Sequence, residues 1–422
     1  MSEETSIPGT HGPENRSQPH AKRLRPRHLL ATLALAAIAW NYWLPTAEDY
    51  FNQTVKPECP PNCDFFAYHL AGEMLQEGKN PYYFEDSQTE TRIRSEFIYP
   101  PAFLPLYRWL ASRSYDTARL LWLELCGIAY GVGFLSLLWV EPGERRANFA
   151  LWAAFLTLTS HPLLIHLRQG QSDLIVTGLV LLSFALHSKG HRHVSAFLLA
   201  LGFLFKVSPV ILLAYFVVFH RDGRYLVTFL VTTLALGGLS LALLPADLYR
   251  DYVLDVLPFL ATGTTYWHNQ SIIRLFAYDP NMARGVTGAG LLGVTWLAWR
   301  LGRARREVPT DGAPQALEAQ SDCATFFFVN ILVTLLFSAY AWPSAYVLTL
   351  LPGARVLATL PRGEHPMWHK VLSAVGVLLL NAKVYGWTAL DSLNLLGNVL
   401  LTCALTTALL VAPQPSPHTP RQ

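Results

Sequence analysis

The chain has 422 residues, of which 52% are hydrophobic and only 14% charged, and its formal net charge is +3. Soluble globular domains carry about a quarter charged residues, so the composition argues against a soluble enzyme, and no nucleic-acid partner is expected. The apolar residues gather in runs long enough to cross a bilayer, at roughly 20 residues a span. We therefore predict an all-α, polytopic transmembrane protein.

The N-terminal part divides into a polar tail and a first apolar run. Residues 1–27 are rich in Pro and His and lead into the basic motif KRLRPRH, which predicts a disordered cytoplasmic tail beside the first span. No small-residue cleavage site follows the run 29–44, so it is interpreted as a retained anchor. Residues 28–412 would then form one membrane domain with a large first outer loop at 46–116, followed by a second disordered tail at 413–422.

Further apolar runs follow this loop, and each is an expected span or part of one. They lie at roughly 117–140, 149–166, 172–188, 194–219, 225–244, 285–301, 324–341, 344–360, 369–387 and 392–412. Basic residues flank many of these runs, and Lys and Arg are enriched on the cytoplasmic side of membrane proteins. The flanking residues are Arg145 and Arg146, Lys189 and Arg192, Arg221 and Arg224, RLGRARR at 300–306, and Arg362 and Lys370.

The run 194–219 decides the topology. If it were one simple span, the basic segments HRDGR and RLGRARR would both lie outside, against the usual distribution of charge. Pro209, in FKVSP, removes a helical hydrogen bond, and broken backbone at membrane depth is tolerated where protein or a cavity surrounds it. We therefore predict a broken hairpin with Lys206 near its tip.

This topology brings most of the chemically notable polar residues to the outer side, and a site between the outer segments is predicted. The outer segments are 46–116, 166–173, 245–283 and 339–346. In the first of them, Cys59 and Cys63 form a disulfide or remain two thiols, and the sequence favours neither. Their CxxxC spacing lacks the further ligands of a tetrahedral zinc site, so no metal is expected.

Asp64 stands at the start of a predicted amphipathic helix that ends at Gly78. The apolar residues of this helix are Phe65, Phe66, Leu70, Met74 and Leu75. Asp is favoured as a helix N-cap, which is a purely structural role. A helix start also holds a carboxylate in one orientation, as a general base requires, so the two interpretations are compatible.

Lys206 lies in the middle of an apolar run, where a lysine is expensive unless it has a partner. A phosphate suits its compact ammonium charge, which makes Lys206 a candidate ligand of a lipid phosphate. An internal ion pair with Asp64 or Asp173 is the structural alternative.

Other polar and aromatic segments are weaker signals. The turn HLRQGQSD places Arg168, Gln169 and Gln171 at a membrane face, toward a cavity or as an interfacial hairpin. In GKNPYYF, Tyr82 anchors the interface or stacks on a sugar. The segment YWHNQSIIRLF adds further polar candidates beside aromatic residues, namely His268, Asn269, Gln270 and Arg274.

Motifs for nucleotide binding and for hydrolytic metal or serine chemistry are absent from the sequence. A nucleotide-driven pump or a nucleotide-sugar enzyme therefore has little support, and no cofactor is expected. An outward cavity with one acid, one deep lysine, an arginine and several amides suits an anionic, lipid-borne substrate such as a lipid-linked sugar phosphate.

Several motifs follow one another along the chain, and a Trp four residues after a Ser comes after them: D-F-F-A-Y, G-K-N-P-Y, Y-P-P, Q-G-Q-S-D, F-K-V-S-P and N-Q-S-x-x-R-L. In this order they resemble glycosyltransferase family 87 of the GT-C superfamily, over about residues 60–360. The resemblance implies a polyprenyl-phosphate donor, commonly of mannose, and transfer on the extracytoplasmic face to a lipid or glycan acceptor. It matches Asp64 to the base and Lys206 to the lysine that binds lipid phosphate. The amide-rich segments match Gln169, Gln171, Asn269, Gln270 and Ser271, with Arg274.

The sequence departs from this family pattern after Trp342. The family often continues with histidines, as in S-P-x-S-W-x-H-H, whereas Pro343, Ser344 and Ala345 follow here and no Pro follows Ser338. His268 is a candidate substitute on the donor side. Because of this departure, the sugar and the acceptor stay open.

The resulting hypothesis is an inverting hexosyltransferase without metal. Asp64 is the base, and Lys206 and Arg168 stabilise the leaving phosphate with Gln169, Gln171 and His268. Asn269, Gln270, Arg274, Tyr82 and Trp342 are assigned to the acceptor or donor sugar. We expect a monomer in a bacterial plasma membrane, with its site toward the periplasm or exterior.

A transporter or flippase of a lipid-linked sugar is the alternative function, although such proteins often show internal repeats. A non-catalytic scaffold is a third interpretation.

Overall fold

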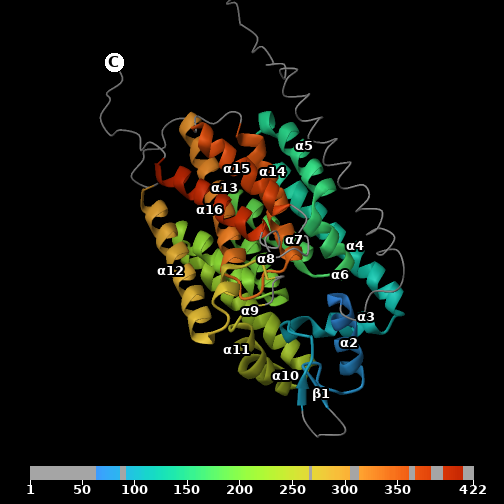
Figure 1. Cartoon of the computed structure of the whole chain (residues 1–422). Helices are drawn as coiled ribbons and strands as arrows, with labels where there is room; N and C mark the ends of the chain where they lie inside the picture. The colour runs from blue at the N-terminus through green and yellow to red at the C-terminus, as the bar shows by residue number, and fades with distance from the viewer. Residues whose placement is uncertain are drawn as a thin grey trace, which may run out of the picture. The chain divides into compact units, whose positions relative to one another are not determined.

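The computed structural model describes residues 63–85, 92–265, 269–304, 313–360, 366–381 and 393–411 (Figure 1). All of them belong to one compact unit, Pro45–Gln422. The other unit, Met1–Leu44, contains the predicted tail and anchor and lies outside the described residues. Cys59, most of the segment before α2, His268 and the predicted tail 413–422 also lie outside them.

The described part is helical apart from one small antiparallel sheet, which confirms the predicted fold class. The sheet pairs β1 (Tyr83–Glu85) with β2 (Arg92–Arg94). The α-helices are α2 (Asp64–Gln76), α3 (Leu104–Ala111), α4 (Tyr115–Val140), α5 (Gly143–Thr159), α6 (His161–Gln169), α7 (Asp173–Ser188), α8 (Arg192–Phe205), α9 (Gly223–Leu243), α10 (Ala246–Asp251), α11 (Leu257–Leu260), α12 (Pro280–Ala304), α13 (Ala313–Leu336), α14 (Leu350–Thr359), α15 (Met367–Leu380) and α16 (Leu393–Val411). Short 3₁₀ segments are η1 (Pro101–Phe103), η2 (Ser208–Leu212), η5 (Ile272–Leu275) and η7 (Pro343–Thr349), and η3 (Ala214–Phe219) and η4 (Tyr252–Val256) are π-helical.

Several of these helices are candidate membrane spans, and the protein is a multi-pass membrane protein. Within the described part, α4, α9 and α16 are each long and apolar enough to cross a bilayer. Helices α5 and α6 form a bent pair, with 57° between them, and shorter apolar helices include α7 and α8. On α9, large apolar side chains such as Leu234 are exposed, as expected of a surface that faces lipid.

The predicted broken hairpin is confirmed. Helix α8 ends at Phe205, Lys206 has extended backbone with φ −153°, and the chain returns through η2, which contains Pro209, and η3. The Arg192 guanidinium lies 3.4 Å from the Asp222 carboxylate, so the beginning and the end of the hairpin lie at the same end of the bundle. Lys206 therefore lies at the turn between the two arms.

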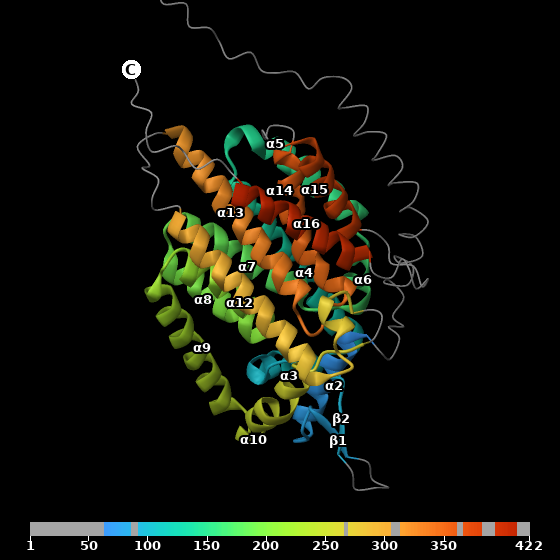
Figure 2. The same ribbon diagram turned by 60° about the vertical axis from the view of Figure 1, so that its left-hand side comes forward.

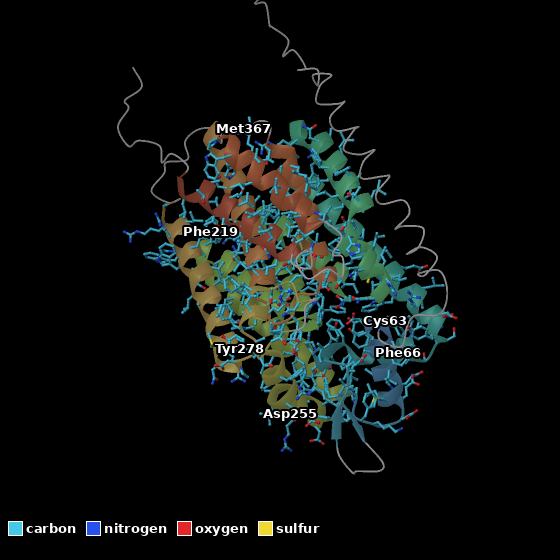
Figure 3. The ribbon with its side chains drawn as sticks, in the orientation of Figure 1. Cys63, Phe66, Phe219, Asp255, Tyr278 and Met367 are labelled. Carbon is cyan, nitrogen blue, oxygen red and sulfur yellow. The ribbon has the colours of Figure 1, made fainter. Side chains whose placement is uncertain are left out.

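The described basic residues near the end of α12 also lie at that same end, as the charge distribution predicts. Gly302, near the end of α12, packs so closely on the Phe219 carbonyl that a side chain would not fit. This contact brings Arg300 and Arg303 next to the basic segment 220–224. In Figures 2 and 3, α5 and Met367 mark this end, whereas α10 and Asp255 lie at the opposite end with α2 and the strands.

The opposite end contains the predicted amphipathic helices of the first loop. Helix α2 approaches α3 closely because Gly72 lies against the Tyr107 backbone, where a Cβ atom would clash. Tyr68 and Tyr107 stack between the two helices, with ring centroids 4.9 Å apart. The aromatic rings of Phe103 and Phe205 also stack, at 3.5 Å, so the segment before α3 lies beside the tip of the hairpin. These contacts between α2, α3 and the hairpin tip hold the start of α2 against the bundle.

Candidate active site

Asp64 is the first residue of α2, and the structure corrects its predicted N-cap role. The N-cap is Cys63, and no side chain caps this helix. The Asp64 carboxylate instead accepts hydrogen bonds from distant segments: from Gln171 Nε2 at 2.7 Å and from the Tyr99 hydroxyl at 3.4 Å. A carboxylate in the first turn also suits the positive end of the helix dipole. Figure 3 shows the adjoining Cys63 at the end of α2 nearest the bundle.

Burial raises the pKa of the Asp64 carboxyl from its ordinary value of 3.8 to about 6. The hydrogen bond from Gln171, the positive charge of Lys206 and the bond from Tyr99 lower this pKa, and the Asp173 charge raises it, but burial has the largest effect. A carboxyl with a pKa near 6 is ionised at neutral pH and still takes up a proton readily. This is the property that a general base needs.

The turn between α6 and α7 delivers Gln171 to the carboxylate. Helix α6 ends at Gln169, and Gly170 follows in the left-handed conformation with φ 64°. A Cβ atom at Gly170 would lie 2.7 Å from the Phe65 Cβ atom, so the turn and the start of α2 fit only with glycine here. The turn thereby places Gln171 beside Asp64.

The Gln171 amide is oriented by partners on both sides. Its oxygen accepts a hydrogen bond from the Ser344 hydroxyl at 2.6 Å, which leaves the amide nitrogen to donate to Asp64. The same nitrogen lies 3.2 Å from Gln169 Oε1. Gln171 and Ser344 are buried, so this chain of hydrogen bonds joins α2, the α6–α7 turn and η7 in one network.

Lys206 forms the internal ion pair that was the structural alternative. Its Nζ atom donates to Asp173 Oδ1 at 2.6 Å, and the Asp173 side chain is buried whereas Lys206 is 21% exposed. Asp173 Oδ2 has no hydrogen-bond partner within the described residues. The Lys206 charge also acts on the pKa of Asp64, so acid and lysine belong to one electrostatic site. The binding of a lipid phosphate by Lys206 stays a prediction.

The segment 269–271 is buried and mainly structural in its contacts. The Asn269 amide donates to the Thr264 carbonyl at 3.1 Å and to the Ala339 carbonyl at 2.9 Å, and its oxygen accepts from the Ala341 backbone at 3.0 Å. Gln270 pairs through its backbone with Ala341 at 2.7 Å. Asn269 therefore fastens this outer segment to the one that precedes η7.

Of the remaining predicted residues, Tyr82 contacts Tyr99, which bonds to Asp64. Tyr82 is fully buried, and its hydroxyl donates to the Tyr99 carbonyl at 2.9 Å, so it supports Tyr99 from behind. Trp342 is the half-buried N-cap of η7, two residues before Ser344. Arg168 and Arg274 are half-buried, at the end of α6 and in η5. His268 lies outside the described residues.

Sequence reasoning did not assign Tyr99, Ser344 or Asp173 to the site. Tyr99 lies in the Y-P-P motif, to which the sequence analysis gives no role. Asp173 belongs to the polar turn and is a possible partner of Lys206, but it has no assigned role in the site. Ser344 carries no local signal, since its partner Gln171 is 173 positions away.

Metal ligands and cysteines were also considered for this site. In the part of the chain that the structure describes, no group of three or more His, Cys, Asp or Glu side chains could hold a metal ion. Cys63 is disulfide-bonded. Cys59, with which the sequence allows but does not favour a disulfide, lies outside the described residues. Cys126 and Cys403 are not disulfide-bonded.

Fold and site together define a multi-pass membrane protein. At one end of its helical bundle it has a half-buried carboxylate and an ion-paired lysine. The family model of glycosyltransferase family 87 matches residues 97–313, just over half of the chain, and the chain belongs to this family. The predicted family and the class of enzyme, a membrane glycosyltransferase, are thereby confirmed.

Among solved structures, the chain is similar to ArnT from Cupriavidus metallidurans, whose crystal structure was determined bound to undecaprenyl phosphate. The two are 14% identical, the match covers 92% of this chain and 78% of ArnT, and the TM-score is 0.39. A comparison with curated proteins found no matching sequence.

Proposed function

We propose that the protein transfers a hexose, with mannose the first candidate, from a polyprenyl-phosphate donor to a hydroxyl group of a lipid or glycan acceptor. The observation that carries this proposal is the Asp64 carboxylate, which has a pKa of about 6 and is held by Gln171 at 2.7 Å within the electrostatic reach of Lys206. One acid and one nearby cation are the groups that a direct displacement at a sugar phosphate needs.

In this mechanism the acceptor oxygen attacks the anomeric carbon of the sugar while Asp64 takes up its proton. The bond between the anomeric carbon and the phosphate oxygen breaks, and polyprenyl phosphate leaves with the electron pair. A single displacement inverts the anomeric centre. Lys206 and Arg168 stabilise the negative charge that develops on the leaving phosphate, which is electrostatic catalysis in a site of low dielectric.

The other predicted residues take supporting roles in this proposal. Gln171 holds Asp64, and Gln169 and His268 are assigned to the donor phosphate. Gln270, Arg274 and Trp342 are assigned to the sugar or the acceptor. Asn269 and Tyr82 act on the site through the segments that they fasten, because their polar atoms bond to protein backbone.

The charge distribution supports the orientation in the membrane. Arg192, Arg221 and Arg224 lie at the end of the bundle opposite Asp64, and Arg300 and Arg303 join them near the end of α12. Basic loops favour the cytoplasm, so the proposed site faces the extracytoplasmic side. We propose a bacterial plasma membrane as the location.

The pH dependence of transfer should report the ionisation of Asp64. Below pH 6 the carboxyl is protonated and cannot act as a base, so kcat/KM is expected to rise about tenfold per pH unit and to level off above pH 6. Gln171→Leu should move the midpoint upward, because the lost hydrogen bond stabilises the ionised form. Glu77→Gln, at an exposed position beyond the end of α2, serves as the control and should leave the midpoint in place. A profile that is flat between pH 5 and 7 would count against Asp64 as the base.

Lys206→Met is expected to raise the donor KM by about 10–100-fold, the usual contribution of a hydrogen bond to a charged group. This substitution also leaves Asp173 buried without its partner, which destabilises the fold. The double variant Lys206→Met/Asp173→Asn removes both charges, so a raised donor KM in a stable double variant isolates the loss of phosphate binding. Lys189→Met, in an exposed loop at the other end of the bundle, should keep the wild-type KM.

The proposed function is tested with the purified protein in proteoliposomes that contain lipid acceptors. Radiolabelled polyprenyl-phosphate mannose is compared with radiolabelled GDP-mannose, and both the sugar product and the released polyprenyl phosphate are measured. Transfer from the lipid donor alone supports the proposal. Transfer from GDP-mannose alone would overturn the donor assignment, and movement of the intact lipid donor across the bilayer without cleavage would favour the transporter.

A further inference from the structure

Helix α4 presents a row of hydrogen-bond donors to the backbone of the α6–α7 turn. An Arg119 guanidinium nitrogen lies 3.4 Å from the Arg168 carbonyl, the Trp122 indole nitrogen lies 2.7 Å from the Gly170 carbonyl, and Cys126 Sγ lies 3.5 Å from the Gln171 carbonyl. The three donors are spaced i, i+3 and i+7, so they lie on one face of α4. We call these three side chains the α4 donor row.

The turn needs such partners. The last carbonyls of a helix have no acceptor role inside it, and here Gly170 turns the chain sharply away from α6. The positive charge of Arg119 also suits the negative end of the α6 dipole. All three side chains of the row are almost completely buried, so their bonds are shielded from water.

Trp122 makes the strongest of these bonds and also contacts the helix that carries Asp64. Its ring lies 5.3 Å from the Tyr68 ring and 6.3 Å from the Phe65 ring, both on α2. One indole therefore touches both halves of the Asp64–Gln171 pair: the aromatic residues beside Asp64, and the backbone directly before Gln171.

We propose that Trp122, assisted by Arg119 and Cys126, is a positioning residue that holds the turn so that Gln171 bonds to Asp64. This role rests on the proposed function of Asp64 as a base. The polar atom of Trp122 bonds to the backbone of the turn and not to the Asp64 carboxylate. It acts through the turn.

Trp122→Phe tests this role because it keeps an aromatic ring and removes the N–H donor. The readout is labelling of Asp64 by a carbodiimide, which reacts with protonated carboxyl groups, followed across pH by mass spectrometry. The wild-type midpoint is expected near pH 6. In Trp122→Phe it should rise by up to about one pH unit, since the bond from Gln171 favours the ionised carboxylate. Transfer should fall about tenfold in kcat with an unchanged donor KM.

The control is Trp139→Phe, the same change at an exposed position near the other end of α4, which should alter neither readout. A double variant separates positioning from loosened packing. If Trp122 acts through Gln171, then Trp122→Phe should add no further shift in a Gln171→Leu background. Should Trp122→Phe fail to fold, Cys126→Ala provides a milder loss from the same row, with a smaller shift in the same direction.

An unshifted labelling midpoint in Trp122→Phe, or fully additive shifts in the double variant, would overturn the positioning role. The labelling readout does not depend on catalysis. Failure of the proposed function, seen as no transfer by the wild type, is therefore distinguishable from failure of this inference.

Discussion

Asp64→Asn should lower the rate of sugar transfer by about 10²–10⁴-fold, which is the usual contribution of a positioned general base. Asparagine has nearly the same shape as aspartate and still accepts a hydrogen bond, so the fold around Gln171 and Tyr99 is expected to persist. It cannot take up the proton of the acceptor hydroxyl. Donor affinity should change little, because Lys206 and Arg168 are the proposed phosphate ligands.

The rate is measured with saturating donor, and donor binding is measured separately by isothermal titration in detergent. Asp255→Asn is the matched control, since this acid lies at the same end of the molecule (Figure 3). It accepts a hydrogen bond from the Tyr83 hydroxyl at 2.7 Å. It should retain wild-type activity. An Asp64→Asn protein that keeps more than a tenth of the wild-type rate would remove Asp64 from its catalytic role.

Gly170→Ala should reduce transfer by about 100-fold through misplacement of the base. Gly170 has φ 64°, which is unfavourable for alanine, and the new Cβ atom would lie 2.7 Å from the Phe65 Cβ atom. Phe65 directly follows Asp64, so the clash moves either the turn or the start of α2. A displacement of about 1 Å at a reacting group can cost about 100-fold in rate.

Gly190→Ala is the matched control for this change. Gly190 also has positive φ, 86°, but nothing lies within 4 Å of the position that its Cβ atom would occupy. Both variants bear the backbone strain, and only Gly170→Ala adds the clash beside Asp64. Kinetic constants and melting temperatures of the two proteins separate the effects. Equal activities would show that the contact between Gly170 and Phe65 does not matter for the site.

Local patterns in the sequence predicted most of the fold. Apolar runs marked the helices, and charge placement together with Pro209 predicted the hairpin, which the Arg192–Asp222 contact confirms. Gly78 has φ 71°, as expected for a residue that ends a helix, and follows the last turn of α2 closely. These features depend on neighbours in the chain or on the bilayer, so they can be inferred without tertiary contacts.

The contacts of the site could be predicted only in part. The N-cap prediction for Asp64 was wrong by one position, because the carboxylate bonds to Gln171, 107 residues away, rather than to its own helix. Lys206 was found from its cost in an apolar run, but its ion pair with Asp173 could be identified only from tertiary structure. Asn269 stood out as a polar residue, but its amide bonds to backbone of the segment before η7.

The most direct test of Asp64 as the base in a single displacement is a paired measurement on wild type and Asp64→Asn. Both proteins are placed in proteoliposomes that contain doubly labelled polyprenyl-phosphate mannose. Wild type should release one polyprenyl phosphate for each sugar transferred, and the product should have the inverted anomeric configuration. Asp64→Asn should bind the donor and do neither. Retained configuration in the product, or equal transfer by both proteins, would contradict a single displacement with Asp64 as the base.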